Sequence, residues 1–433
     1  MAVVAASDYT VSNLHSRILF DVSGLLQWYA YLRHPSGVQR VCERILQSKV
    51  IAASPDVVLI ARAPGGDAFH RIEHGLIEDL ARPDRRDSAI VQMRRQFAAM
   101  LRLSRLALLR EDLRILHLPY LAMGWLPSLR ALQVVSPQQG DVIVGLGDFW
   151  CHRGHVAALL RLKRQARLIH MIHDLFVLDH PEWSHPYFGR LVGDKLRALA
   201  PHVDRWLTTS RFVAGELDRF LRPRIASIDL VPMGADVFAP EDPGVFRRHG
   251  LVPNSYILHV GTLEPRKNLI ALLDAVERVP QAWPLVLVGR DGWRSKEIHR
   301  RLRRARKGVA CWIPDAADSE LTSLYRGARF TVVPSFGEGW GLPVQESLAQ
   351  GVPCIAARAG ALPEVGGDLV RYVEPGDTDG LAAAITDWST NPTALAQAQR
   401  RIAASGKLRR SSWDDAAAQV LNSVTIARFL ASA

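Results

Sequence analysis

Long apolar runs and closely spaced cysteines are both missing from this sequence. The chain has 433 residues and four cysteines. Its apolar runs are broken by charges well short of the roughly 20 residues needed to cross a bilayer. The first six residues, Met1–Ala6, have neither the length nor the basic flank of a signal peptide. We therefore expect a cytoplasmic protein without a transmembrane helix.

The spacing of the possible metal ligands predicts no metal site. The four cysteines, Cys42, Cys151, Cys311 and Cys354, lie far apart, which argues against a disulfide framework and a zinc site. His152 and His155 lie near Cys151, but no fourth ligand is placed nearby. Asp377 and Asp379 have a spacing that can hold Mn²⁺ or Mg²⁺. They directly precede a helical segment, so we interpret them as a turn and a helix cap. We expect no metal or other cofactor.

The net charge of +11 is concentrated in two segments. Residues 82–114 carry nine arginines against four acids, and residues 290–307 carry nine basic groups against two acids. Such faces are suited to an anionic partner, either membrane phospholipid or nucleic acid, although two solvated helix faces would look the same. Within 94–109 a helix would place four apolar residues on one arc, namely Phe97, Met100, Leu101 and Leu108. Further leucines interrupt that arc, so this helix could also belong to the core.

The rest of the chain alternates short β-rich apolar runs with helical segments. A single core seldom grows past about 250–300 residues, so this length predicts two domains. The alternation predicts an α/β fold in which each domain has a parallel sheet. Ligands of such sheets bind beyond the carboxyl ends of the strands, so two facing domains would share a cleft. The expected strands are 18–22, 57–61, 142–147, 168–173, 206–209, 228–232, 256–261, 285–289, 309–313, 330–334 and 354–357.

The segment 335–346, Ser-Phe-Gly-Glu-Gly-Trp-Gly-Leu-Pro-Val-Gln-Glu, is the most informative part of the chain. It follows an apolar strand and precedes a helical run, and it sets Glu338 and Glu346 eight positions apart around a glycine-rich turn. Free amides at a helix N-terminus stabilise phosphate, and carboxylates accept paired hydrogen bonds from vicinal hydroxyls. The pattern therefore predicts a nucleotide-sugar site. A strand-turn-helix corner with one capping and one solvated glutamate is the alternative.

These motifs together resemble the family 4 retaining glycosyltransferases of the GT-B fold. The resemblance runs from about 204 to 387 and includes the Glu-x7-Glu element. It also includes His259-Val-Gly-Thr-Leu-Glu-Pro-Arg-Lys-Asn-Leu269 and Gly360-Ala-Leu-Pro-Glu364. The first half matches more loosely, through His173-Asp174 and through Ser36-Gly-Val-Gln-Arg40. The resemblance implies two Rossmann-like domains facing across a cleft. We expect an acceptor domain at 1–236, a linker at 237–254, a donor domain at 255–410, and a helix at 411–433 that packs back on the first domain.

The resemblance assigns most of the donor site to the second half. Arg266 and Lys267 would stabilise the nucleotide diphosphate as it leaves, since fixed cations favour developing negative charge. Glu338 would touch the donor sugar and Glu346 would bind the ribose. Many relatives have an arginine where this chain has Thr262, so how these roles divide among Thr262, Arg266 and Lys267 stays open. The remaining expected donor contacts are Gly37, Gly261, Gly339, Trp340, Gly341 and Leu342.

The first half would supply the other wall of the site. His173 matches the family histidine that touches the donor sugar, although a histidine beside a strand can also be a core residue. Asp148 and Asp174 are candidate acceptor-binding residues at expected strand ends. No carboxylate pair has the spacing of a glycosidase or of a nucleophile with its base. We therefore expect transfer on one face of the sugar, with the leaving phosphate helping to deprotonate the acceptor.

The resemblance is strongest to bacterial mannosyltransferases of exopolysaccharide or O-antigen assembly. It implies GDP-mannose as donor and a lipid-linked glycan as acceptor, at the anionic inner face of the membrane. A UDP-sugar-dependent transferase or a hydrolysing epimerase of the same fold is the alternative. An alternative of another class is a nucleic-acid-binding protein that uses the basic faces. The sequence shows no aromatic and basic platform for bases, so we expect no nucleic acid partner.

Overall fold

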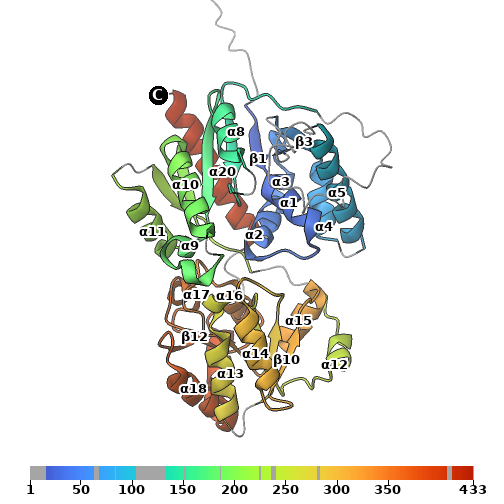
Figure 1. The fold of residues 1–433 in the computed structure, drawn as a ribbon, viewed down its shortest axis with the longest axis vertical. Coiled ribbons are helices and arrows are strands. Elements are labelled where there is room, and N and C mark those ends of the chain that lie inside the picture. The colour runs from blue at the N-terminus through green and yellow to red at the C-terminus, as the bar shows by residue number, and fades with distance from the viewer. Residues whose placement is uncertain are drawn as a thin grey trace, which may run out of the picture.

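The computed structural model describes residues 16–62, 68–82, 84–103, 133–150, 153–185, 187–223, 226–235, 240–279, 283–406 and 412–432. Two α/β domains lie one above the other, each built on its own sheet (Figure 1). The predicted fold class is therefore confirmed.

The N-terminal domain has a seven-stranded sheet in the order β3-β2-β1-β4-β5-β6-β7. Every neighbouring pair is parallel except β2 and β3. The central strands are almost wholly buried because helices cover both faces, as is usual for parallel sheets. The strands are β1 (Ile18–Asp21), β2 (Val57–Ala61), β3 (His70–Ile72), β4 (Asp141–Gly145), β5 (Ala166–Ile172), β6 (Arg205–Thr208) and β7 (Ser227–Leu230).

The helices of this domain lie in two groups, one on each face of the sheet. Their apolar residues pack into two separate clusters, which belong to the two faces. They are α1 (Ser23–Tyr31), α2 (Gly37–Leu46), α3 (Lys49–Ala52), α4 (His74–Leu80), α5 (Arg86–Leu103), α8 (His155–Leu162), α9 (Phe176–Asp179), the 3₁₀ turn η1 (Pro181–Trp183), α10 (Phe188–Leu199), η2 (Ala200–His202) and α11 (Arg211–Leu221).

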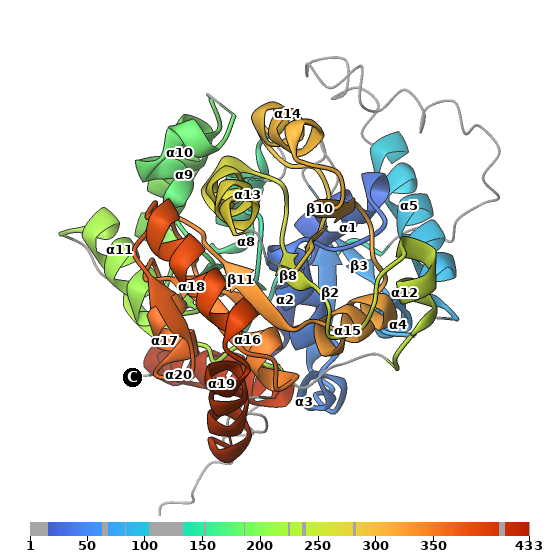
Figure 2. The ribbon, with the colours of Figure 1, turned by 90° about the horizontal axis from the view of Figure 1, so that it is seen from below.

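The C-terminal domain has a six-stranded sheet, β10-β9-β8-β11-β12-β13, in which every neighbouring pair is parallel. Figure 2 shows β11 between α13 and α18 on one side and α15 and α16 on the other. The strands are β8 (Ile257–Val260), β9 (Leu285–Val288), β10 (Ala310–Ile313), β11 (Phe330–Val333), β12 (Cys354–Ala357) and β13 (Arg371–Val373). The helices are α12 (Gly244–His249), η3 (Pro265–Lys267), α13 (Leu269–Arg278), α14 (Lys296–Arg304), α15 (Asp318–Arg326), α16 (Leu342–Ala349), α17 (Leu362–Gly366), α18 (Thr378–Thr390) and α19 (Pro392–Ala404).

The last helix, α20 (Trp413–Ser432), lies on the N-terminal domain. It contacts α2, α3 and the strands β4 to β6, and Figure 1 shows it among the elements of that domain. Small buried residues, Ala416 and Ala417, let its backbone approach closely. Arg428 donates to the Ser16 carbonyl at 2.6 Å and pairs with Asp56 at 3.2 Å. The chain therefore crosses from the second domain back to the first.

Of the two interpretations left open for the apolar arc on 94–109, the structure supports the core at Phe97. Phe97 of α5 is fully buried in the core and meets the ring of Tyr31 edge to face. Arg94 of the same helix donates to the Tyr29 carbonyl at 2.9 Å. The side chains of Met100 and Leu101, and the whole of Leu108, lie outside the described residues. The apolar side of α5 is thus directed at the protein core, because an arc of this kind serves a core as well as a bilayer.

Candidate active site

The interface between the two domains holds a buried carboxylate that is paired with two cations. Glu338, in the loop after β11, accepts from Lys267 Nζ at 2.6 Å and from Arg266 Nη1 at 2.8 Å. Ser335 Oγ donates a third hydrogen bond at 2.6 Å. Burial by itself raises the pKa of Glu338, but the two cations and these hydrogen bonds outweigh it and hold that pKa well below its usual range. The carboxylate is therefore ionised at neutral pH.

The two cations come from η3, the turn that follows β8. Arg266 also pairs with Glu264 at 2.7 Å and donates to the Gly337 carbonyl at 2.7 Å. Its guanidinium lies 5.7 Å from the centre of the Phe176 ring in the other domain. Lys267 is 7% exposed and is held in place by Glu338. A short turn thus presents two positive charges at the carboxyl end of the second sheet.

The glycine-rich loop packs directly against the N-terminal domain. A Cβ atom on Gly339 would lie 2.0 Å from the His173 carbonyl oxygen, so only glycine fits there. The Gly339 carbonyl accepts from the hydroxyls of Thr209 and Ser210 at 2.9 and 2.8 Å. At Gly341, φ is +108°, which also favours glycine, and α16 begins at Leu342. The loop is therefore fixed by contacts that only the two domains together provide.

Glu346 lies on α16 and is bound from both domains. Its Oε2 accepts from Tyr325 at 2.8 Å, and its Oε1 pairs with Arg40 of the N-terminal domain at 3.0 Å. Arg40 also pairs with Asp318 at 3.2 Å, as does Arg44 at 2.8 Å. Burial lowers the pKa of Arg40, but Asp318 and Glu346 outweigh burial and raise it. This ion-pair network links the segment around Gly37 to the second glutamate of the motif.

Trp340 lies next to this network. Its Nε1 donates to Gln345 Oε1 at 2.7 Å, and Gln345 Nε2 donates to the Met233 carbonyl at 2.6 Å. The indole is therefore tied to α16 and, through Gln345, to the N-terminal domain.

His173 follows β5, and its backbone carbonyl packs against the glycine-rich loop. Its Nε2 lies 2.6 Å from the Leu146 carbonyl oxygen, a distance that requires this nitrogen to carry a proton and donate. Burial lowers the pKa of His173 below its usual value, so the ring is neutral and Nδ1 is the unprotonated nitrogen. The ring can therefore accept a hydrogen bond at Nδ1.

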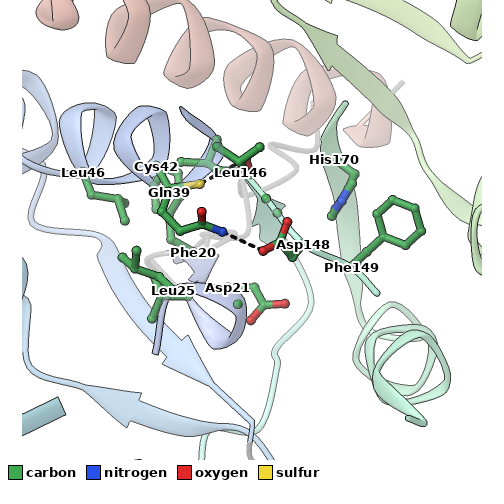
Figure 3. A pocket seen from close by; sticks show the side chains of 15 residues that line it. Phe20, Asp21, Leu25, Gln39, Cys42, Leu46, Leu146, Asp148, Phe149 and His170 are labelled. Atoms are coloured by element: carbon green, nitrogen blue, oxygen red, sulfur yellow. Dashed lines mark hydrogen bonds between the residues drawn. The ribbon is translucent and has the colours of Figure 1, made fainter. Parts of the chain in front are cut away.

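Asp148 lies in a pocket of the N-terminal domain rather than against the loop. Figure 3 shows it facing Gln39 of α2, whose Nε2 donates to Asp148 Oδ2 at 2.8 Å. The pocket is also lined by Cys42, Leu146 and His170. Asp174, in contrast, lies at the domain interface, where its Cβ is 3.0 Å from the position of a Cβ on Gly339. The two candidate acceptor residues thus occupy different surroundings.

The pKa of Asp148 predicts a pH dependence of stability. Burial raises this pKa to about 6, and the hydrogen bond from Gln39 only partly opposes the rise. The unfolded carboxyl titrates near 3.9, so the folded state binds more protons between about pH 4 and pH 6, and stability falls as pH rises through that window. The free energy of unfolding should therefore fall by about 2–3 kcal/mol between pH 4 and pH 7, and Asp148→Asn should remove this fall. Urea unfolding at pH 4 and pH 7 measures the difference, with Asp218→Asn on the surface as control.

Thr262 and the two aspartates considered as metal ligands, Asp377 and Asp379, all make contacts within the C-terminal domain. The Thr262 methyl carbon lies 2.5 Å from where a Cβ on Gly292 would be, so this position packs against backbone. Asp377 accepts from the Gly380 amide and caps α18, and Asp379 pairs with Arg278 at 2.6 Å. Among the described residues, no group of three or more histidine, cysteine, aspartate or glutamate side chains could hold a metal ion.

Three residues that join the two domains were not assigned roles from the sequence. Arg40 and Asp318 form the network around Glu346, and Glu364 of α17 accepts from the amides of Arg211 and Phe212 at 2.9 and 2.8 Å. Glu364 thereby caps α11 of the other domain. Arg40 and Glu364 both lie inside motifs noted above, which is the signal that could have found them.

Comparisons with known proteins identify relatives of this chain. A model of the family described as Glycosyl transferases group 1 matches residues 246–409. The chain is 30% identical to the O-antigen chain mannosyltransferase B of Escherichia coli, over 60% of this chain and 70% of that protein. It is 29% identical to the MMP alpha-(1->4)-mannosyltransferase of Mycolicibacterium hassiacum, over 68% and 73%.

Solved structures of other proteins have a similar fold. Sucrose-phosphate synthase from Thermosynechococcus elongatus superposes with a TM-score of 0.65 at 19% identity, covering 97% of this chain and 100% of that one. At this identity the likeness concerns the fold alone. Together with the relatives above, it shows that this chain belongs to the group 1, or family 4, glycosyltransferases and has their GT-B fold.

Proposed function

We propose that this protein transfers mannose from GDP-mannose to a glycan acceptor in polysaccharide assembly, with retention of the anomeric configuration. The observation that carries the proposal is the contact of Glu338 with Lys267 and Arg266 at the domain interface. The choice of mannose is supported by the two relatives, both of which are named mannosyltransferases.

The two cations suit a diphosphate leaving group. When the bond between the sugar C1 and the phosphate oxygen breaks, negative charge grows on the diphosphate, and positive groups already fixed beside it lower the barrier. Lys267 and Arg266 are held by Glu338 and Glu264, so they need no reorganisation to act. The backbone amides of 339–342 would add donors to the same anion.

The sugar would lie between Glu338 and His173. Glu338 keeps its charge, and the unprotonated Nδ1 of His173 can accept from a sugar hydroxyl. The acceptor oxygen would bond to C1 on the face that the phosphate leaves, and its proton would pass to a phosphate oxygen. One carbon–oxygen bond breaks, one forms, and no protein base is consumed.

We propose further that the acceptor is lipid-linked and that the protein works at an anionic membrane face. No helix among the described residues is long and apolar enough to span a bilayer. The basic face of α14 and its C-terminal end support the proposal, because Arg300, Arg303, Arg304 and Lys307 are exposed. Near an anionic surface each such side chain is worth about 1 kcal/mol.

A donor screen tests the proposal. Purified protein is incubated with GDP-mannose or with UDP-sugars and a pool of lipid-linked sugars, and the product linkage is read by NMR. An α-mannosyl product from GDP-mannose alone is expected. A product from UDP-sugars only, or an epimerised sugar without acceptor, would favour the same-fold alternatives.

Sedimentation with anionic liposomes tests whether the protein works at an anionic membrane face. Wild-type protein that stays in solution at low salt, where electrostatic attraction is least screened, contradicts that proposal.

Replacing Glu346 should weaken donor binding. In the proposed complex Glu346 accepts from the ribose hydroxyls, and a hydrogen bond to a charged group is worth about 1.5–3 kcal/mol. Glu346→Ala should therefore raise the donor Kd roughly ten- to a hundredfold in calorimetry. This change also removes one of the two ion-pair partners of Arg40. Asp318→Asn removes the other partner and serves as the control, because Asp318 is not expected to touch the donor. Equal effects of both changes would assign Glu346 to the interdomain network alone.

Transfer should not need a divalent cation. Two cationic side chains already lie where the diphosphate is expected, which is the role that a metal would otherwise fill. Turnover in excess EDTA should equal turnover in added Mg²⁺. Activity lost on chelation and restored by Mg²⁺ or Mn²⁺ would show that a metal shares the site.

A further inference from the structure

Aromatic side chains of both domains meet at one edge of the domain interface. Trp183 of η1 stacks on Phe336, with centroids 6.0 Å apart and planes 14° from parallel. His180 stacks on the Trp183 ring at 3.9 Å. A second pair, Phe188 and Trp293, stacks across the domains at 5.8 Å and 25°. We call these side chains the aromatic lip. It consists of His180, Trp183, His185, Tyr187, Phe188, Trp293 and Phe336.

The aromatic lip is continuous with the candidate active site. Phe336 lies two positions before Glu338. Phe176 contacts Trp183 at 5.9 Å between centroids and carries the guanidinium of Arg266 over its ring. The segment from α9 through η1 to Phe188, the first residue of α10, therefore begins beside Arg266 and contacts the C-terminal domain along its length. Figure 1 shows α9 directly above the C-terminal domain and α10 above α9.

Contact between the domains does not account for all of this aromatic surface. Tyr187 is 72% exposed and Trp293 is 49% exposed, although Trp293 already stacks on Phe188 with one face. Phe336 is 37% exposed. Large aromatic side chains gathered at the surface mark a place where another molecule binds.

The charges around the aromatic lip are mixed in sign. Glu182 is exposed and its carbonyl accepts from Arg294 at 2.8 Å, so one positive group is already engaged by the backbone. The flanking charged residues are Asp179, Glu182, Asp291, Arg190 and Arg294. A surface of this kind does not select an anion. It suits a neutral ligand that has an apolar face and polar edges.

We propose that the aromatic lip binds the sugar rings of the acceptor glycan that lie beyond the reacting residue. The C–H face of a pyranose ring packs on an aromatic ring, and its hydroxyls at the edge reach histidine, carboxylate and carbonyl groups. Trp293 and Tyr187 supply the rings, and His185 and Glu182 supply polar partners beside them. This inference rests on the proposed function and adds that long glycans bind better than short ones.

Kinetics with acceptors of different length test the aromatic lip. Trp293→Ala and Tyr187→Ser should each raise KM for a long manno-oligosaccharide about three- to tenfold. KM for a short one, and the GDP-mannose Kd, should not change. Trp293→Phe should restore most of the affinity. Phe429→Ala is the matched control, because Phe429 is an exposed aromatic residue at the far end of α20. An equal loss for short and long acceptors would overturn the proposal.

A binding measurement separates this proposal from the proposed function. Manno- and gluco-oligosaccharides are titrated into protein without donor, and tryptophan fluorescence is followed. Saturable binding that weakens in Trp293→Ala supports the aromatic lip even if GDP-mannose proves to be the wrong donor. Wild-type protein that binds none of these oligosaccharides overturns it. Loss of vesicle binding in Trp293→Ala, with oligosaccharide kinetics unchanged, would assign the surface to a membrane instead.

Discussion

Lys267→Ala is expected to lower kcat about 10²–10³-fold while changing the donor Kd far less. The ammonium group is buried, lies 2.6 Å from Glu338, and is placed where negative charge would grow as the diphosphate leaves. Removing one fixed charge from such a site costs about 3–4 kcal/mol in the transition state. An interaction made mainly in the transition state lowers kcat and kcat/KM together. Single-turnover kinetics and calorimetry with the unreacted donor separate the two quantities.

Two further variants serve as controls for Lys267→Ala. Lys296→Ala removes an exposed lysine from α14 and should leave kcat unchanged. Lys267→Arg keeps the charge but not the shape, so partial activity is expected. Arg266 and Ser335 still bind Glu338 in Lys267→Ala, which limits the loss of stability. A variant with a raised donor Kd and a normal kcat would show that Lys267 binds the ground state only.

The strands that the sequence predicts well are those with buried apolar runs. β2 and β12 have the expected bounds, because Val57–Ala61 and Cys354–Ala357 are short and mostly apolar and are flanked by loop residues. β3 and β13 were not predicted. Each has three residues at a sheet edge and includes an arginine, Arg71 or Arg371, so neither shows an apolar run. Pairing with a neighbouring strand, which the local sequence does not encode, makes them strands.

Some contacts of the candidate site could be predicted from the sequence and others could not. Glu338 and Arg266 belong to motifs that each follow a strand of one sheet, so their meeting at its carboxyl edge could be predicted. The contact of Arg40 with Glu346 joins residues 306 positions apart and depends on how two domains pack, which no local pattern specifies. Phe97 shows a further limit. An apolar arc predicts that one side of a helix is buried, but not whether protein or lipid buries it.

The second large effect is expected at Gly339, whose position depends on both domains. A methyl group there would lie 2.0 Å from the His173 carbonyl oxygen, so Gly339→Ala must push the loop away from the N-terminal domain. The hydrogen bonds from Thr209 and Ser210 would lengthen, and Glu338, the next residue back along the chain, would shift relative to His173. A misplacement of about 1 Å can cost 10²-fold in rate, so we expect a loss of roughly that size or more.

The control for this substitution is Gly215→Ala in α11, where nothing lies within 4 Å of the new methyl group. Alanine there should stabilise the helix by about 1 kcal/mol and leave transfer unchanged. Circular dichroism shows whether Gly339→Ala is folded, and kcat with GDP-mannose gives the effect on transfer. Because the clash is with backbone, a flexible side chain cannot relieve it. A folded Gly339→Ala protein with normal turnover would mean that catalysis does not use this closed arrangement of the two domains.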